Sequence, residues 1–551
     1  MAENKLTPQY YVLPEGASRI IGREAQRQNI MVGQAVANAV KTTLGPKGMD
    51  KMLVSDLGDI VITNDGATIL NEMNVEHPVA KILVEIAKTQ DKEVGDGTTT
   101  VVVIAGGLLK GAGELIEQGV HPTTIIAGYK LAADKAIEIL KGHAKNIDTS
   151  DDAVLQKIAM VTLGSKNVGD EHVKSVLSKM VIKAVKQVMV KNEKGANYVD
   201  RDLIKLEKKV GGNIEDTQYI NGVLIDKEIS HPSMPRKIEK AKIALLDLAL
   251  EIEKTETEAK IEITAPEQMK AFLEQEESIL KEMAEKIKKS GATVVFTQKG
   301  IDDVAQHFLA KLGVTAYRRV KKSDLEMLAR ATGGNIITTL DDLSGADLGY
   351  AGLVEERKIS GEFMTFVEQC KNPKSVTIFV RGSSQQAVDE LERSIVDVIG
   401  VVSSIMQYNT YVLGGGAIQV EMAQQLRSAA DHVSGREQLA MQAFADALEG
   451  IPKALAENSG MDSIDTLVQL RSKHKGKDGE IYGVDVLKGG VGDMSKLGVL
   501  EPTRVIEQAI RSASEAAEIV LRIDDMISGK GKSGGAGGMP PGGGMGGAPE
   551  Y

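Results

Sequence analysis

The sequence GDGTTT occupies residues 95–100 and runs directly into the apolar stretch VVVIA at 101–105. Gly95 and Gly97 allow the backbone to approach a bulky ligand in conformations that other residues avoid. The helix that the apolar stretch predicts would present free N–H groups in its first turn, where phosphates bind. Asp96 beside a phosphate implies a cation between them, because Mg²⁺ is commonly held by a carboxylate together with phosphate oxygens. The hexapeptide therefore indicates a metal–nucleotide site, and a glycine turn with a threonine cap on a core helix is an equally good alternative.

Two further glycine-bearing loops lie close by in the chain. TLGPKG at 43–48 follows a helix that the four-residue recurrence of Val32, Val36 and Val40 predicts, and by itself it is an ordinary helix stop. The stretches at 52–54 and 60–62 predict a hairpin that leads into NDG at 64–66. NDG is first of all turn chemistry, so Asp65 alone is better explained as a turn residue than as a catalyst. Three such loops close together, two of them with an aspartate, favour the nucleotide site.

These three motifs resemble the nucleotide-site motifs of the chaperonins. The resemblance continues in GGGA at 414–417, YGVD at 482–485, EPTRV at 501–505 and LRIDDMI at 521–527. The chain is similar to the group II chaperonins, most of all to the archaeal thermosome subunits, over residues 10–527 and in the same order. This resemblance implies an ATP-dependent molecular chaperone that encloses unfolded polypeptides in a double-ring chamber with a built-in lid. It also implies a Mg-dependent ATPase, with ATP and Mg²⁺ as its ligands.

The resemblance further implies a multi-domain chain, with a mostly α-helical equatorial domain, a small α+β intermediate domain and an α/β apical domain with a helical protrusion. The residue patterns agree with this. Thr98–Glu117 and Thr123–Leu140 predict helices, and short apolar stretches at 222–225, 243–246 and 292–296 predict strands. The expected boundaries are 1–149 and 411–527 for the equatorial domain, 150–218 and 372–410 for the intermediate domain, 219–371 for the apical domain with its protrusion at about 254–291, and 528–551 for a disordered Gly/Met-rich tail.

The segment 254–291 combines two kinds of sequence. TAPE at 264–267 is a capping box and opens a helix with an apolar stripe from Met269 to Ile287. A core-facing amphipathic helix is the better interpretation for the C-terminal half of this stripe. The preceding KTETEAK at 254–260 is too polar for a core. A lid function for the whole segment rests on the resemblance alone.

The resemblance also implies roles for individual residues. Asp397 would orient the attacking water with Asp65 opposite, which suits phosphoryl transfer because that reaction demands mainly positioning and charge neutralisation. Lys166 would sense the γ-phosphate, although the sequence alone favours a solvated loop lysine. The remaining assignments are Asp96 as the Mg²⁺ ligand, Gly97, Thr98, Thr99 and Thr100 at the β- and γ-phosphates, Thr43, Leu44, Gly45 and Pro46 on the opposite wall, and Gly415, Asp485 and Glu501 at the ribose and adenine.

One segment departs from the family pattern. Val398 stands where the family usually has alanine after ERSxxD, and Leu413 stands where proline precedes GGGA. Gln419 replaces an acidic residue. Asp397 itself is retained, so catalysis should survive, whereas the departures put the base-side contacts and any subunit contact through Gln419 in question.

Composition limits the alternatives. The chain of 551 residues is too long for one hydrophobic core, and 42% hydrophobic with 26% charged residues is ordinary for a globular protein. A net charge of −11 argues against nucleic-acid partners, and no stretch is expected to approach the length of a membrane helix. The single Cys370 suits a reducing cytoplasm, and the scattered histidines predict no zinc site. The expected partners are unfolded or partly folded proteins and other chaperonin subunits, and the rival functions are a nucleotide-binding scaffold and a metabolic kinase.

Overall fold

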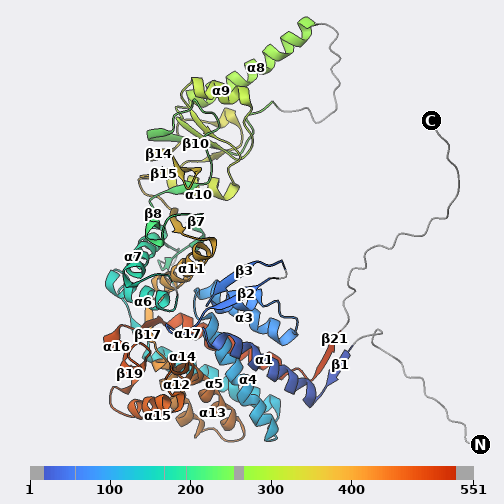
Figure 1. The fold of residues 1–551 in the computed structure, drawn as a ribbon, viewed down its shortest axis with the longest axis vertical. Coiled ribbons are helices and arrows are strands. Elements are labelled where there is room, and N and C mark those ends of the chain that lie inside the picture. Colours follow the sequence, from blue (N-terminus) through green and yellow to red (C-terminus); the bar gives the residue numbers. More distant parts are fainter. Residues whose placement is uncertain (1–17, 56, 167, 194, 253–265, 529–551) are drawn as a thin grey trace, which may run out of the picture.

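The computed structural model describes residues 18–55, 57–166, 168–193, 195–252 and 266–528, which form three regions in line along the long axis of Figure 1. A helical region lies at one end and contains the first and last described segments of the chain. A smaller mixed region follows, and a region built on a sheet lies at the other end. The chain crosses from the helical region to the sheet region and returns, so distant sequence segments meet in the first two regions.

The helical region is built around α4 (Thr98–Glu117), as the apolar stretch predicts. Val101, Ile104 and Leu108 on α4 are fully buried, because α1, α13 and α17 pack around this helix. The predicted hairpin is confirmed as β2 (Lys51–Val54) paired antiparallel with β3 (Ile60–Thr63). The other helices are α1 (Arg23–Lys41), α2 (Gly66–Glu72), α3 (Pro78–Val94), α5 (Pro122–His143), α12 (Ala417–Ala430), α13 (Glu437–Leu448), α14 (Gly450–Asn458), α15 (Ser463–His474), α16 (Met494–Leu497) and α17 (Thr503–Leu521).

Short strands complete this region. The first described strand, β1 (Ser18–Ile21), pairs antiparallel with the last, β21 (Asp525–Ser528). The other pairings are β18 (Tyr482–Asp485) with β19 (Gly490–Asp493), and a three-stranded sheet in the order β20 (Leu500–Pro502), β17 (Thr410–Leu413) and β4 (Lys145–Asn146).

The expectation about membrane helices is wrong as far as length is concerned. By length and composition α4 could cross a membrane, since it has 20 residues and its most apolar window has a mean hydropathy of 1.5. However, 61% of that window is buried inside the protein. The apolar character of α4 is that of a core helix, because its apolar residues are covered by other helices while Lys110 and Glu114 leave one side exposed.

The mixed region joins two helices from the first half of the chain to one from the second half. These are α6 (Asp152–Gly164), α7 (Glu171–Val188) and α11 (Gln385–Tyr408), which share a buried apolar cluster. Beside them lies a three-stranded sheet in which β16 (Val376–Gly382) runs parallel to β7 (Ile204–Val210) and antiparallel to β8 (Gln218–Ile220). A small hairpin, β5 (Val190–Lys191) with β6 (Asn197–Tyr198), completes the region.

The sheet region confirms the three strands that the sequence predicts. Its seven-stranded sheet has the order β12 (Thr315–Tyr317), β11 (Val294–Thr297), β10 (Lys237–Leu246), β14 (Gly349–Ile359), β15 (Glu362–Glu368) and β9 (Val223–Ile225), with β13 (Ile336–Ile337) paired to β10. The strands β10, β11 and β12 are parallel, and β11, β12 and the last four residues of β10 are buried, as strands covered by helices should be. The helices of this region are α8 (Pro266–Lys289), α9 (Asp303–Lys311) and α10 (Lys322–Thr332).

The helix α8 projects from this region (Figure 1), and its two halves differ as predicted. Leu280 and Ile287 in the C-terminal half are buried, whereas Met269 and Leu273 are about half exposed. The polar stretch at 254–260, most of the capping box at 264–267 and the tail at 529–551 lie outside the described residues.

The helix α11 touches the loop between α3 and α4 through a contact between two glycines. Gly95 adopts a left-handed φ of 77° and ends α3. A Cβ atom on Gly400 of α11 would stand 2.5 Å from the Cα of Gly95, and one on Gly95 would stand 2.6 Å from the Cα of Gly400. The close atoms belong to the backbone, so a side chain at either position would have to push α11 and the loop at Gly95 apart. Both positions therefore require glycine.

We expect Gly400→Ala to lower the midpoint of thermal unfolding. Alanine favours a helix by about 1 kcal/mol over glycine, but overpacking against backbone costs about 1–3 kcal/mol and here forces α11 away from the loop at Gly95. Differential scanning calorimetry gives the comparison. The matched control is Gly142→Ala in α5, where an added Cβ meets nothing within 4 Å, so the variant should be neutral or more stable. Equal behaviour of the two variants would contradict the close approach.

Candidate functional site

A single cavity collects the segments that the sequence singles out. It lies where the loops after α1, β3 and α3 face the end of α6 and the segments that begin α12 and α17. Asp397 is not part of the cavity wall, and it contacts the wall residue Lys166 from behind. The predicted residues that line the cavity are Thr43, Leu44, Gly45, Pro46, Asp65, Asp96, Gly97, Thr98, Thr99, Thr100, Lys166, Gly415, Asp485 and Glu501.

The N-terminus of α4 forms one wall. Gly97 is its N-cap with a left-handed φ of 81° and no side-chain cap, which leaves the first N–H groups of the helix directed at the cavity. Gln90 holds this loop, because its Nε2 donates to the carbonyl oxygens of Asp96 at 2.9 Å and Val505 at 3.0 Å. A fixed helix N-terminus with free N–H groups is a binding site for anions such as phosphate.

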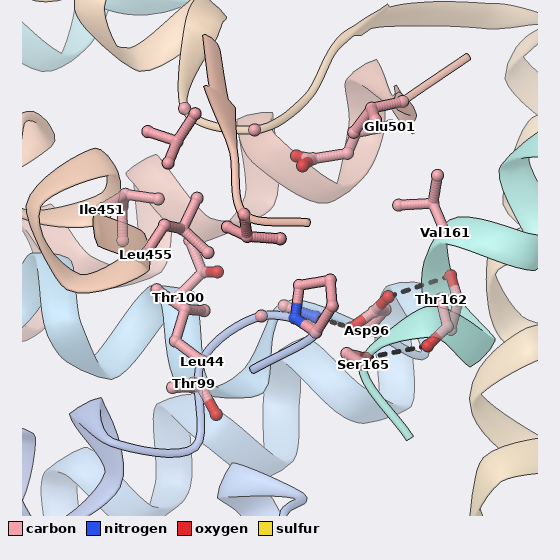
Figure 2. A pocket seen from close by; sticks show the side chains of 18 of the residues that line it. Leu44, Asp96, Thr99, Thr100, Val161, Thr162, Ser165, Ile451, Leu455 and Glu501 are labelled. Carbon is pink, nitrogen blue, oxygen red and sulfur yellow. Dashed lines mark hydrogen bonds between the residues drawn. The ribbon is translucent and has the colours of Figure 1, made fainter. Parts of the chain in front are cut away.

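Asp96 lies between this loop and the end of α6. Its Oδ1 accepts a hydrogen bond from the Gly97 N–H at 2.6 Å, and its Oδ2 accepts one from the Thr162 hydroxyl at 3.1 Å. Figure 2 shows Asp96, Thr162 and Ser165 grouped on one side of the cavity, with Leu44, Thr99 and Thr100 on the other side. The Asp96 carboxylate is therefore oriented from two sides within the cavity.

Asp65 combines the two roles that the sequence left open. It is the N-cap of α2, where its Oδ2 accepts from the Thr68 N–H at 2.8 Å, and so it is a turn residue. Its Oδ1 accepts a hydrogen bond from the Thr98 hydroxyl at 2.9 Å, so Asp65 also contacts the wall that the N-terminus of α4 forms. Burial alone would raise the pKa of Asp65, but the positive charge of Lys166 and the hydrogen bonds hold this pKa below its ordinary value. Asp65 is therefore ionised at neutral pH.

Lys166 is not the solvated loop lysine that the sequence alone favours. Its side chain is 7% exposed and its Nζ lies 2.5 Å from Oδ2 of Asp397, which is equally buried. Burial alone would lower the pKa of Lys166, but Asp397, Asp65 and Asp96 raise it above the ordinary value. A lysine on the end of α6 thus carries a permanent charge among three aspartates from three other segments.

Burial raises the pKa of Asp397 well above its ordinary value. Lys166 opposes this effect, whereas the charges of Asp65 and Asp96 add to it. One ammonium group cannot neutralise three carboxylates, so the cluster favours a further positive charge, either a proton or a cation.

The other end of the cavity is mostly apolar. Ile451 and Leu455 of α14 point into it (Figure 2), and Val484 of β18 lies nearby. The loop before α12 passes close to this wall, because a Cβ on Gly415 would stand 2.5 Å from Sδ of Met494. An apolar cleft next to a helix N-terminus that suits phosphate is the arrangement expected where a nucleotide binds with its base in the cleft.

Two acidic residues flank the apolar end. Asp485 accepts hydrogen bonds from the N–H groups of Leu487 and Lys488, so it shapes the turn between β18 and β19. Glu501 also lines the cavity (Figure 2). Burial, with a contribution from the charge of Asp96, raises the pKa of Glu501 to about 7.

Several wall residues were missed by sequence reasoning. Thr162 lines the cavity and bonds to Asp96, and Asn64 lines it and contacts the end of α6. Gln90 lies outside the lining and holds the loop at Asp96 through a hydrogen bond. Asn64 belongs to NDG, for which the sequence predicts only a turn. Gln419 is 2% exposed and lines the cavity, so in this structure it does not lie on a surface where another subunit could reach it.

The residues at the cavity fit a magnesium ion that a phosphate helps to hold. Among the described residues no group of three or more His, Cys, Asp and Glu side chains is arranged to bind a metal alone. Mg²⁺ is usually bound through one or two carboxylates plus substrate phosphates and water. Asp96 at the helix N-terminus and the surplus of negative charge around Lys166 supply that donor set.

Comparisons with known proteins identify the family of the chain. The family model of the TCP-1/cpn60 chaperonin family matches residues 36–531. A thermosome subunit of Methanopyrus kandleri is 57% identical over 521 residues, which cover 94% of this chain and 95% of that protein. A thermosome subunit of Methanocaldococcus jannaschii is 56% identical over 517 residues, or 94% of each chain. The thermosome subunit beta of Methanothermobacter thermautotrophicus is 56% identical over 538 residues, or 98% of each.

The chain belongs to the TCP-1/cpn60 chaperonin family, and the resemblance seen in its motifs is confirmed. It is a multi-domain protein with helical and mixed α/β regions, as predicted. Membership of this family makes the chain a group II chaperonin, which is an ATP-dependent chaperone.

We expect Glu501→Gln to stabilise the protein increasingly as the pH rises from 5 to 8. The Glu501 carboxyl keeps its proton up to about pH 7 in the folded chain but loses it near pH 4.5 when unfolded. The unfolded state therefore binds fewer protons in between, and the wild type loses stability with rising pH, by up to about 3 kcal/mol. Glutamine has no proton to lose. The measurement is the difference between the unfolding midpoints of variant and wild type at each pH, and a difference that does not change with pH would contradict the prediction.

Proposed function

We propose that this chain is a subunit of a double-ring, group II chaperonin that encloses unfolded or partly folded proteins and couples their folding to Mg-dependent ATP hydrolysis in the cavity. ATP-dependent chaperone activity follows from membership of the family. The observation that supports hydrolysis is the buried ion pair between Lys166 and Asp397. Lys166 lines the cavity together with the N-terminus of α4 and two further aspartates.

The nucleotide would lie across the cavity from the α4 N-terminus to the apolar end. The N–H groups and hydroxyls of Thr98, Thr99 and Thr100, with Gly97, suit the β- and γ-phosphates. The segment from Thr43 to Pro46 faces them as the opposite wall. Gly415, Asp485 and Glu501 lie at the apolar end, where the ribose and the adenine would bind.

The acidic residues suit hydrolysis of the γ-phosphate. Asp397 has a raised pKa, which is appropriate for a group that orients a water molecule and accepts its proton, and it would become accessible from the cavity once Lys166 leaves it for the γ-phosphate. Asp65, whose pKa the charge of Lys166 lowers, stays ionised. Lys166 would contact the γ-phosphate and stabilise the charge that spreads over it. When bound, Mg²⁺ would be held by Asp96 and would neutralise part of the phosphate charge.

The three regions of the structure support the expected domains as a proposal. The equatorial domain would comprise 1–149 and 411–527, the intermediate domain 150–218 and 372–410, and the apical domain 219–371. The partly exposed apolar side chains Met269, Phe272 and Leu273 on α8 suit a lid that meets other subunits or clients. Other chaperonin subunits would complete the ring, and the cytoplasm, expected from the single cysteine, would be its location.

A scaffold that binds nucleotide without hydrolysing it is the main alternative. Such a protein needs the helix N-terminus and the apolar cleft but no excess of carboxylates. Asp65, Asp96 and Asp397 all surround Lys166, and burying them costs stability that a scaffold would have no reason to bear. This favours the hydrolase.

We expect Asp397→Asn to keep ATP binding and lose most hydrolysis. Asparagine preserves the shape but cannot accept the proton, so kcat should fall by about 10²–10⁴-fold while the Kd for ATP changes little. Phosphate release under steady state and calorimetric binding give the two values. Asp389→Ala is the control, because Asp389 lies on the same helix, is partly exposed and pairs with Lys208 away from the cavity, and this variant should turn over ATP as the wild type does. Near-normal turnover in Asp397→Asn would refute the role of this residue.

Asp96→Ala should act differently, because the loss of a metal ligand weakens the binding of Mg–ATP itself. We expect the Mg²⁺ concentration for half-maximal turnover to rise by about 10-fold or more. Turnover is not abolished, because the phosphate oxygens of ATP still bind the ion. A titration with Mg²⁺ at saturating ATP measures it. An unchanged magnesium dependence would exclude Asp96 as the ligand.

A further inference from the structure

Asn64 lies between two parts of the site and has no role in the assignments above. It follows β3 and precedes Asp65, it is 6% exposed, and it lines the cavity. Its Nδ2 donates a hydrogen bond to the carbonyl oxygen of Ser165 at 2.5 Å. This bond joins the loop of Asp65 to the end of α6, 101 residues further along the chain.

The bond is made one residue before Lys166. Ser165 is the C-cap of α6, and the Lys166 N–H bonds back to the carbonyl oxygen of Leu163 at 3.1 Å. Carbonyl groups at a helix C-terminus lack partners within the helix, so the Ser165 carbonyl is available to an outside donor. Asn64 supplies that donor and fixes the backbone from which the Lys166 side chain extends towards Asp397.

The oxygen of the same amide is not hydrogen-bonded as its nitrogen is. Among the described residues, Oδ1 of Asn64 has no hydrogen-bond partner although it is buried. A buried acceptor without a donor costs about 1–3 kcal/mol. The amide keeps its bond to the Ser165 carbonyl at this cost, which indicates that the orientation of Asn64 is set by the contact with the end of α6.

The geometry points to Asn64 as a positioning residue that docks the Ser165–Lys166 segment onto the loop of Asp65 and so sets Lys166 for ATP hydrolysis. This inference rests on the proposed function of the cavity. It differs from a purely structural role in one respect: the effect of Asn64 on turnover passes through Lys166.

The first test compares Asn64→Ala and Asn64→Asp. The aspartate has the same shape and fills the site, but it cannot donate to the Ser165 carbonyl, so it reports on the hydrogen bond if the alanine variant is unstable. Both variants should lower kcat by about 10–100-fold, as expected for a misplaced catalytic group, while KM for ATP changes by less than about threefold. A kcat within about twofold of wild type in both variants would overturn the inference.

The second test is a double-mutant cycle with Lys166→Ala. If Asn64 acts through Lys166, the variant Asn64→Ala/Lys166→Ala should turn over ATP at the rate of Lys166→Ala alone. Independent roles would instead multiply the two losses, and that result would overturn the inference. An inactive wild type would instead refute the proposed function of the cavity, so the two failures can be told apart.

The third test needs no turnover. Hydrogen exchange of a peptide that ends at Lys166 should be faster in Asn64→Asp than in wild type without nucleotide, because the end of α6 has lost its anchor. Asn29→Ala is the matched control, since Asn29 is a buried amide on α1 outside the cavity. Its turnover and its exchange at α6 should match the wild type. Equal exchange in Asn64→Asp and wild type would contradict the docking role.

Discussion

The site depends on one buried ammonium group shared by three carboxylates. Lys166 extends from the end of α6, Asp397 belongs to α11, and Asp65 and Asp96 belong to two loops of the helical region. Lys166, Asp65 and Asp397 are buried, and none of them could remain charged alone, because removing an ion from water costs several kcal/mol unless partners compensate for it. The four residues therefore hold their segments together, and the segments hold the four residues in place.

This arrangement links the cavity to the shape of the molecule. The end of α6 meets the helical region through three interactions at the cavity: Thr162 with Asp96, Ser165 with Asn64, and the charge of Lys166 with those of Asp65 and Asp96. A ligand shifts a conformational equilibrium only through interactions that differ between the two states. A phosphate that neutralises Lys166 while its cation neutralises Asp96 would change these contacts, and the mixed region would move with them. In this way a small change of charge can reach the sheet region that carries α8.

Much of this could be predicted from local sequence. The helix α4, the hairpin of β2 and β3, the buried strands and the C-terminal half of α8 follow from residue periodicity, because each pattern acts within its own element. That the nucleotide motifs share one cavity could be predicted only from the family resemblance, because no local pattern shows that residue 96 lies near residue 485.

Burial was the main quantity that the sequence did not reveal. Lys166 looks like a surface lysine because nothing near it in the chain marks the aspartate that covers it, and that aspartate lies on α11. Gln419 and Asn64 look like a subunit contact and a turn residue for the same reason. The expectation that no stretch is long enough for a membrane helix failed at α4. This helix has enough apolar residues for a membrane span because they fill the centre of a helical core.

The most direct test of the charge balance is the stability of Lys166→Met beside that of Lys166→Met/Asp397→Asn, measured by chemical unfolding without nucleotide. Methionine fills the space of lysine but leaves Asp397 buried without its partner, which typically costs about 3–5 kcal/mol. The account predicts this loss in the single variant and recovery of most of it in the double variant, where both charges are gone. A single variant as stable as the wild type, or a double variant no better than the single one, would contradict it.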